Sequence, residues 1–142
     1  MKTISYGAML SFLFASAAAS EGQPSRGADL FERNCAACHS IITPEGRTIA
    51  GKGRENAPNL NGLFDRTPGS QTGFRYGVAL ASYATKADRW DRESFVAYVM
   101  DPTGFLRTRL GDRRARSRMS YRLRNERDAI DIFSFILETQ SR

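Results

Sequence analysis

The segment Cys35-Ala36-Ala37-Cys38-His39 holds both cysteines and the only histidine of the 142-residue chain. In this C-x-x-C-H arrangement each cysteine sulfur can add to one vinyl group of a haem, and the histidine after the second cysteine can reach the iron. The haem would then carry the redox chemistry, and the protein would tune it. The segment therefore predicts a covalently attached haem, around which the chain must fold.

Three other roles for a C-x-x-C pair fit the sequence less well. A zinc site needs four ligands, and no further Cys or His exists in the chain. A thioredoxin-like redox pair needs a βαβ pattern with a strand running into the motif, and none is visible. A disulfide between Cys35 and Cys38 would close a very short loop and add little stability. Thiol chemistry remains the alternative to haem attachment.

Residues 1–19 are typical of a secretory signal peptide. Lys2 is their only charge, a short apolar stretch spans 9–14, and the alanines at 17–19 allow cleavage at their end. The apolar run is too short and too interrupted to span a bilayer well. We expect export to a bacterial periplasm or a similar compartment, with residues 20–142 left as one small domain. A retained membrane anchor is the alternative.

Apolar residues at helical spacing predict four helices, separated by long irregular stretches at 40–75 and 102–124. The helices begin at Ser25, after Tyr76, at Trp90 or Asp91, and at Asn125. Pro102 ends the third, because the residue before a proline is pushed out of the α region. Irregular stretches of this length are unusual in a small domain. They are compatible with an all-α fold of about four helices and long loops that close over one covalently attached haem.

Two methionines follow the predicted signal peptide and could supply a sixth iron ligand. Met100 lies on the apolar face of the third helix beside Val96 and Val99, where core packing explains it. Met119 lies in a polar, basic loop, where core packing does not explain a methionine. Spacing therefore favours Met119 as the partner of His39, with Met100 as the alternative. His/Met ligation would raise the reduction potential and leave no open position on the iron.

Haem propionates carry negative charge and must be paired or solvated. The Arg66 guanidinium, the Tyr76 hydroxyl and the Trp90 indole N–H are candidate donors. Each of the three also has an ordinary alternative role: Arg66 as a solvated surface residue, Tyr76 in a half-buried loop and Trp90 in the core.

Positive charge is concentrated in one part of the chain. Residues 107–127 hold nine arginines against Asp112 and Glu126, which makes this segment +7 and leaves −1 for the rest of a chain whose net charge is +6. A local basic field steers docking onto acidic partner surfaces. A solvated loop, or unspecific binding to nucleic acid or anionic lipid, is the alternative, and export argues against nucleic acid. The arginines expected to form the docking surface are Arg107, Arg109, Arg113, Arg114, Arg116, Arg118 and Arg122.

Several segments spread over residues 26–140 share the spacing of a known family. They are Gly27-x3-Phe31 before the pentapeptide, Pro58-Asn59-Leu60-x-Gly62-Leu63-Phe64-x-Arg66, Gly73-Phe74-x-Tyr76, Trp90-x7-Tyr98-x3-Pro102 and Ser117-Arg118-Met119-Ser120-Tyr121. With the pentapeptide, they resemble class I cytochromes c of the soluble periplasmic bacterial type. The stretch from Phe105 to Met119 is longer than in mitochondrial relatives and fits the type with a long distal loop.

The resemblance implies an all-α fold in which His39 and Met119 are the axial ligands. It also implies that the Pro58 carbonyl accepts a hydrogen bond from His39, and that Gly27 allows the first helix to cross the last closely. It implies that the haem surroundings include Arg66, Tyr76, Trp90 and Tyr98.

The function expected from these observations is one-electron transfer by a diffusible, monomeric carrier that is not an enzyme and has no transmembrane span. Its partners would be acidic surfaces of a quinol:cytochrome c oxidoreductase, a terminal oxidase or a photosynthetic reaction centre. The alternative is a dedicated electron-accepting cytochrome subunit of a periplasmic dehydrogenase, for which a large apolar surface patch would speak. A haem enzyme or gas sensor would need an open sixth position.

Overall fold

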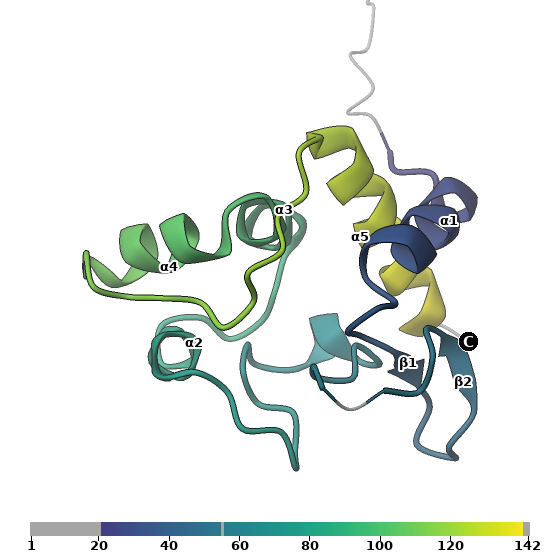
Figure 1. Ribbon diagram of the computed structural model, residues 1–142, viewed down its shortest axis with the longest axis horizontal. Helices are drawn as coiled ribbons and strands as arrows, with labels where there is room; N and C mark the ends of the chain where they lie inside the picture. The colour runs from purple at the N-terminus through teal and green to yellow at the C-terminus, as the bar shows by residue number, and fades with distance from the viewer. Residues whose placement is uncertain (1–20, 55, 141–142) are drawn as a thin grey trace, which may run out of the picture.

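The structure of the chain is a computed structural model that describes residues 21–54 and 56–140 (Figure 1). The predicted signal peptide therefore lies outside the described residues. Within them the chain forms five α-helices, one short 3-10 helix and a two-stranded sheet. Their bounds are α1 Pro24–Asn34, β1 Ile41–Ile42, β2 Thr48–Ala50, η1 Leu63–Asp65, α2 Val78–Ala84, α3 Arg92–Met100, α4 Pro102–Leu110 and α5 Glu126–Gln140.

Helices α1 and α5 cross in close contact at one glycine (Figure 1). A Cβ atom built on Gly27 would lie 2.0 Å from the carbonyl oxygen of Asp131, so only glycine fits there. One turn further along α1, the fully buried ring of Phe31 packs on Phe135 of α5, with ring centroids 5.7 Å apart. The close approach that the resemblance implies at Gly27 is therefore present.

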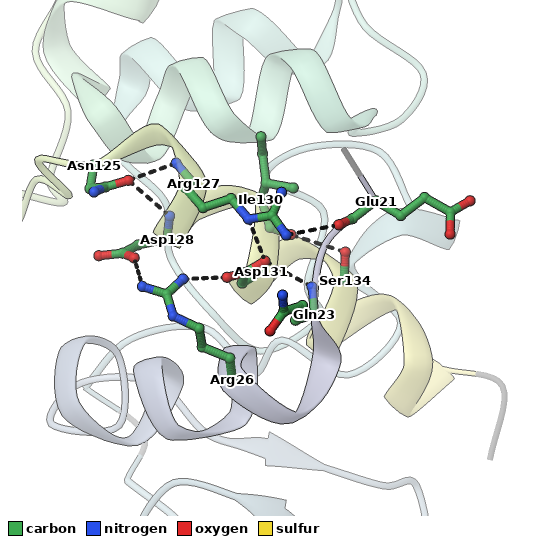
Figure 2. A network of polar contacts seen from close by, with 9 residues as sticks. All are labelled: Glu21, Gln23, Arg26, Asn125, Arg127, Asp128, Ile130, Asp131 and Ser134. Atoms are coloured by element: carbon green, nitrogen blue, oxygen red, sulfur yellow. Dashed lines mark hydrogen bonds and ion pairs between the residues drawn. The ribbon is translucent and has the colours of Figure 1, made fainter. Parts of the chain in front are cut away.

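A buried carboxylate joins the start of α1 to α5 (Figure 2). Asp131 Oδ1 accepts a hydrogen bond of 2.8 Å from the backbone N–H of Gln23 and lies 3.3 Å from Arg127 Nε. Its second oxygen pairs with Arg26, whose other guanidinium nitrogen pairs with Asp128. Burial alone would raise the pKa of Asp131, but the Gln23 N–H and the two arginines outweigh it and hold that pKa below its usual range. The carboxylate therefore stays ionised inside the crossing.

The prediction of an irregular segment over 102–124 is wrong for its first part, because Pro102–Leu110 forms α4. Pro102 does end α3, but it also occupies the first position of the next helix, where its missing N–H costs nothing. Asp101 caps that helix, since its side chain accepts the Gly104 N–H at 3.0 Å. Gly111, with φ 66°, ends α4 in the left-handed region.

The segment predicted to be irregular over 40–75 also contains regular structure, namely the β1–β2 hairpin and η1. The hairpin pairs Ile41 with Ala50 in antiparallel register. Its turn is closed by the Thr43 N–H, which donates to the Arg47 carbonyl at 2.9 Å, and by Gly46 at φ 84°. Strands of two and three residues are too short to produce a period in the sequence.

Candidate functional site

A cavity of about 410 Å³ opens between the elements, a size typical of cofactor pockets. Its wall comes from the end of α1, the loop before and after η1, helices α2, α3 and α5, and the segment that follows α4. The apolar part of the wall consists of Leu60, Leu63, Phe74, Leu80, Phe95, Val99, Leu123, Ile132 and Ile136.

All the residues predicted to bind or surround a haem line this one cavity. They are Cys35, Cys38, His39, Pro58, Arg66, Tyr76, Trp90, Tyr98 and Met119. Both methionines pack against the hydrophobic core, but Met100, the alternative ligand, is not among the lining residues of this cavity. Residues from positions 35 to 119 thus converge, although their individual roles remain predictions.

The two cysteines lie on the turn that ends α1. The N–H groups of Cys38 and His39 both donate to the Cys35 carbonyl, at 3.0 and 2.8 Å, which presents both thiols and the imidazole within one turn. The sulfurs are not joined. Burial, followed by the charges of Cys38 and Glu32, raises the pKa of Cys35 to about 12. A reactive redox cysteine needs a depressed pKa, so the thioredoxin-like alternative does not fit this site.

The His39 imidazole is fixed in one orientation. Its Nδ1 lies 2.9 Å from the Pro58 carbonyl oxygen, and because a carbonyl can only accept, Nδ1 carries the proton. Burial lowers the pKa of His39, while the Pro58 carbonyl acts in the opposite direction. The ring is therefore neutral with a free lone pair on Nε2, which is the form that ligates a metal.

Backbone and side-chain hydrogen bonds hold the Pro58 loop against the segment that follows His39. Asn59 accepts the Ile42 N–H at 3.0 Å and donates to the Ile42 carbonyl at 2.8 Å. The Leu60 N–H donates to the Ser40 carbonyl at 2.9 Å. The acceptor of the His39 proton is therefore part of a rigid support.

Arg66 and Tyr76 form a polar corner of the cavity. Arg66 donates to the carbonyls of Asn59 and Asn61, both at 2.5 Å, and is half-buried, which does not fit its alternative role as a solvated surface residue. Burial lowers the pKa of Arg66 and raises that of Tyr76, and contact between the two side chains opposes both shifts. A cation and a hydroxyl donor thus lie side by side at the wall, suited to bind carboxylates.

Trp90 belongs to an aromatic cluster behind the cavity wall. Its ring lies 5.0 Å from that of Tyr98 and 5.7 Å from that of Tyr83, measured between centroids. Trp90 is buried and lines the cavity at the same time. Its position is compatible with both roles that the sequence leaves open.

Met119 lies in an irregular segment that hydrogen bonds tie to several elements. Its N–H donates to Ser117 Oγ at 3.1 Å, and the Ser117 and Tyr98 hydroxyls are 2.9 Å apart. On the other side of Met119, the Tyr121 hydroxyl donates to Asn34 Oδ1 at 2.6 Å. The sequence does not indicate roles for Asn34 and Ser117. The small polar residues on both sides of Met119 are a signal that could have found Ser117, whereas nothing near Asn34 points to Tyr121, 87 positions away.

All seven arginines of the predicted docking surface are exposed, but only two of them line the cavity. Arg116 and Arg118 do so, and Arg118 also donates to the Arg75 carbonyl at 2.8 Å. Arg113 and Arg114 lie in the turn that follows α4. The other three have contacts within the chain: Arg107 Nε donates to the Ala115 carbonyl at 3.1 Å, Arg109 lies 3.7 Å from Glu93 and over the Phe105 ring, and Arg122 lies 3.0 Å from Asp101.

In the described part of the chain, no helix has the length and apolar character needed to cross a membrane.

Comparison with known proteins agrees with the site. The family model for cytochrome c matches residues 24–140. A cytochrome c2 of Cereibacter sphaeroides is 39% identical over 136 residues, which cover 95% of this chain and 93% of the relative. A cytochrome c-550 of Novispirillum itersonii is 30% identical over 115 residues, covering 81% and 96%. The crystal structure of cytochrome c2 from Rhodobacter sphaeroides has a TM-score of 0.80 and 40% identity, covering 83% of this chain and 96% of that one.

The donor set of the cavity fits a covalent haem c. Two free thiols lie within one turn of a neutral imidazole whose Nε2 is free, a thioether lies in the same lining, and most of the remaining wall is apolar. Together with the match over nearly the whole length, these features show that the chain belongs to the cytochrome c family and is an electron carrier with one covalently attached haem c.

Proposed function

We propose that this chain is an exported, diffusible one-electron carrier whose haem is attached through Cys35 and Cys38 and ligated through His39 and Met119. The observation that carries the proposal is the His39–Pro58 hydrogen bond, which leaves Nε2 free in a cavity that Met119 also lines. When bound, the haem supplies an iron that takes up and releases one electron.

The side chains around the cavity would allow electron transfer but not catalysis on a bound substrate. His39 is held by a rigid acceptor loop, and an iron held by both His39 and Met119 would leave no place for a substrate or oxygen. Apolar side chains of the wall exclude water, and Arg66 with Tyr76 would donate to the haem carboxylates. This arrangement favours outer-sphere electron transfer over catalysis, and on that ground we propose that the protein is not an enzyme.

The exposed arginines would determine which partner surfaces the carrier docks onto. Arg116 and Arg118 lie at the cavity, and the others continue the positive field along α4 and the turn after it. This field would attract acidic surfaces of a quinol:cytochrome c oxidoreductase, a terminal oxidase or a photosynthetic reaction centre in small, transient contacts. We propose that residues 1–19 direct the chain to the periplasm and are removed there, and that the carrier is a monomer.

The carrier function is favoured over a dehydrogenase subunit, because the relatives that match most of the chain are cytochromes c2 and c-550.

The test is the visible and near-infrared spectrum of the ferric and ferrous holoprotein, with Met119→Ala compared with Met100→Ala. We expect a low-spin spectrum with a Met–iron charge-transfer band that Met119→Ala abolishes and Met100→Ala keeps. A high-spin wild type that binds carbon monoxide rapidly would overturn the carrier function. Loss of the band in Met100→Ala alone would overturn the assignment of the ligand.

A further inference from the structure

Helix α4 touches the segment that carries Met119 through two side chains. Thr103 Oγ1 accepts the Ser117 N–H at 3.2 Å, and Arg107 Nε donates to the Ala115 carbonyl at 3.1 Å. Thr103 and Arg107 are four residues apart, so they lie on one face of the helix about 6 Å apart along its axis. Two residues of extended chain cover about 6.6 Å, close to the same step. The distance between Thr103 and Arg107 along α4 is therefore close to the distance that an extended chain spans between Ala115 and Ser117. We call residues 115–119, which run back along α4, the returning segment.

These two contacts lead directly to Met119. Ser117, whose N–H is held by Thr103, accepts the Met119 N–H on its own hydroxyl and lies 2.9 Å from the Tyr98 hydroxyl of α3. Ala115, whose carbonyl is held by Arg107, is 5% exposed and anchors the segment in the core. Thr103 and Arg107 are not among the cavity-lining residues. Their direct hydrogen bonds are to the segment that carries Met119, so the shortest route from these two side chains to the site runs through that segment.

We propose that Thr103 and Arg107 are positioning residues that keep the segment 115–119 closed and thereby govern how often Met119 leaves the haem iron. The inference rests on the proposed ligation by Met119. Irregular segments open at a lower free energy than packed helices, so single hydrogen bonds count heavily in such a segment. Removing one of them raises the open population about three- to tenfold. The role of Arg107 is a charge-assisted hydrogen bond from its Nε–H to the Ala115 carbonyl, not an ion pair.

The test compares Thr103→Val, Arg107→Lys and the double variant with matched controls in the ferric holoprotein. Thr108→Val makes the same change on an exposed position of the same helix, and Arg47→Lys makes the same change on the exposed hairpin turn, outside the docking surface. Arg107→Lys keeps the charge and loses the Nε–H that the Ala115 carbonyl accepts. Imidazole at low concentration is the probe, and bleaching of the Met–iron band gives its binding rate. Amide hydrogen exchange reports opening of the segment without reference to the iron. It is read at Ser117 for Arg107→Lys and at Met119, whose N–H donates to Ser117 Oγ, for Thr103→Val, because that variant removes the acceptor of the Ser117 N–H itself.

We expect the rate of imidazole binding and the rate of amide exchange to rise about three- to tenfold in each single variant. In the double variant each rate should rise roughly by the product of the two single-variant increases. Thr103→Ser, which keeps the hydroxyl, should stay near wild type. Thr108→Val and Arg47→Lys should not change either rate. The inference is overturned if Thr103→Val and Arg107→Lys behave like their controls, or if amide exchange in the segment rises while imidazole binding does not.

A wild type without a Met–iron band would contradict the proposed ligation instead, and the Ser117 exchange would still show whether α4 holds the segment. If Thr103→Val does not accumulate as a folded protein, the same two rates measured in Arg107→Lys decide whether the inference holds.

Discussion

The α1–α5 crossing and the segment around Met119 are stabilised by different kinds of contact. The crossing combines a helix approach that only glycine permits with a buried carboxylate bound by two arginines and a backbone N–H. The Met119 segment has no regular structure and depends on single hydrogen bonds to α1, α3 and α4. One region therefore secures the fold as a whole, and the other can open locally without unfolding the protein.

The largest effect is expected at the crossing glycine. Gly27→Ala places a Cβ 2.0 Å from the Asp131 carbonyl oxygen, so the two helices must move apart. We expect the free energy of unfolding to fall by at least about 3 kcal/mol. Denaturant unfolding of the holoprotein, followed by far-UV circular dichroism, measures it. Asp29→Ala, an exposed change on the same helix, should stay within about 0.5 kcal/mol. A loss below about 1 kcal/mol for Gly27→Ala would mean that the crossing is not tightly packed.

A smaller and pH-dependent effect is expected at Asp131. Asp131→Asn leaves Arg26 and Arg127 facing a neutral group, and we expect a loss of about 2 kcal/mol at pH 7, limited by the partial exposure of both arginines. The pKa of Asp131 is lowered by folding, so its carboxylate contributes stability above the unfolded value of about 3.9. This contribution fades as the pH falls through the folded pKa. Unfolding curves from pH 7 to 3 should therefore converge for wild type and variant, and a constant difference would contradict the ionised carboxylate.

The smallest effect on stability is expected at Arg116, an exposed residue of the cavity rim. Arg116→Gln should leave the unfolding free energy unchanged within about 0.5 kcal/mol. It should slow reduction of the ferric protein by the anion ferrocyanide about two- to tenfold at about 10 mM ionic strength, where screening is weak. The difference should vanish at about 1 M salt. Arg47→Gln, on the hairpin turn, is the control, and an equal effect there would mean that net charge alone matters.

The core of the site could be predicted from the sequence because the chemistry is local. Two thiols and an imidazole within five residues leave few alternatives, and the resemblance to class I cytochromes c implies the helix crossing at Gly27. The sequence does not predict α4, because a proline after an apolar helical face indicates the end of α3. In the structure Asp101 caps a second helix that begins at the same proline. The sequence carries no sign of the Gln23–Asp131 hydrogen bond, since 108 positions separate the two residues. The Thr103–Ser117 contact, across 14 positions, depends on a turn after α4 that no periodicity predicts.

The anchoring of the Gln23 N–H by Asp131 also decides where the protein can be attached to a surface. The start of the described chain is held beside α5, and residues 21–32 do not line the cavity. In Figure 1 this purple end and the turn after α4 lie on different sides of the molecule. A linker joined ahead of Glu21 would therefore leave the arginine-bearing turn free. Coupling to an electrode through the amino end should preserve electron exchange with partners in solution, because the tether would be attached at the α1–α5 crossing and not at the arginine-bearing turn.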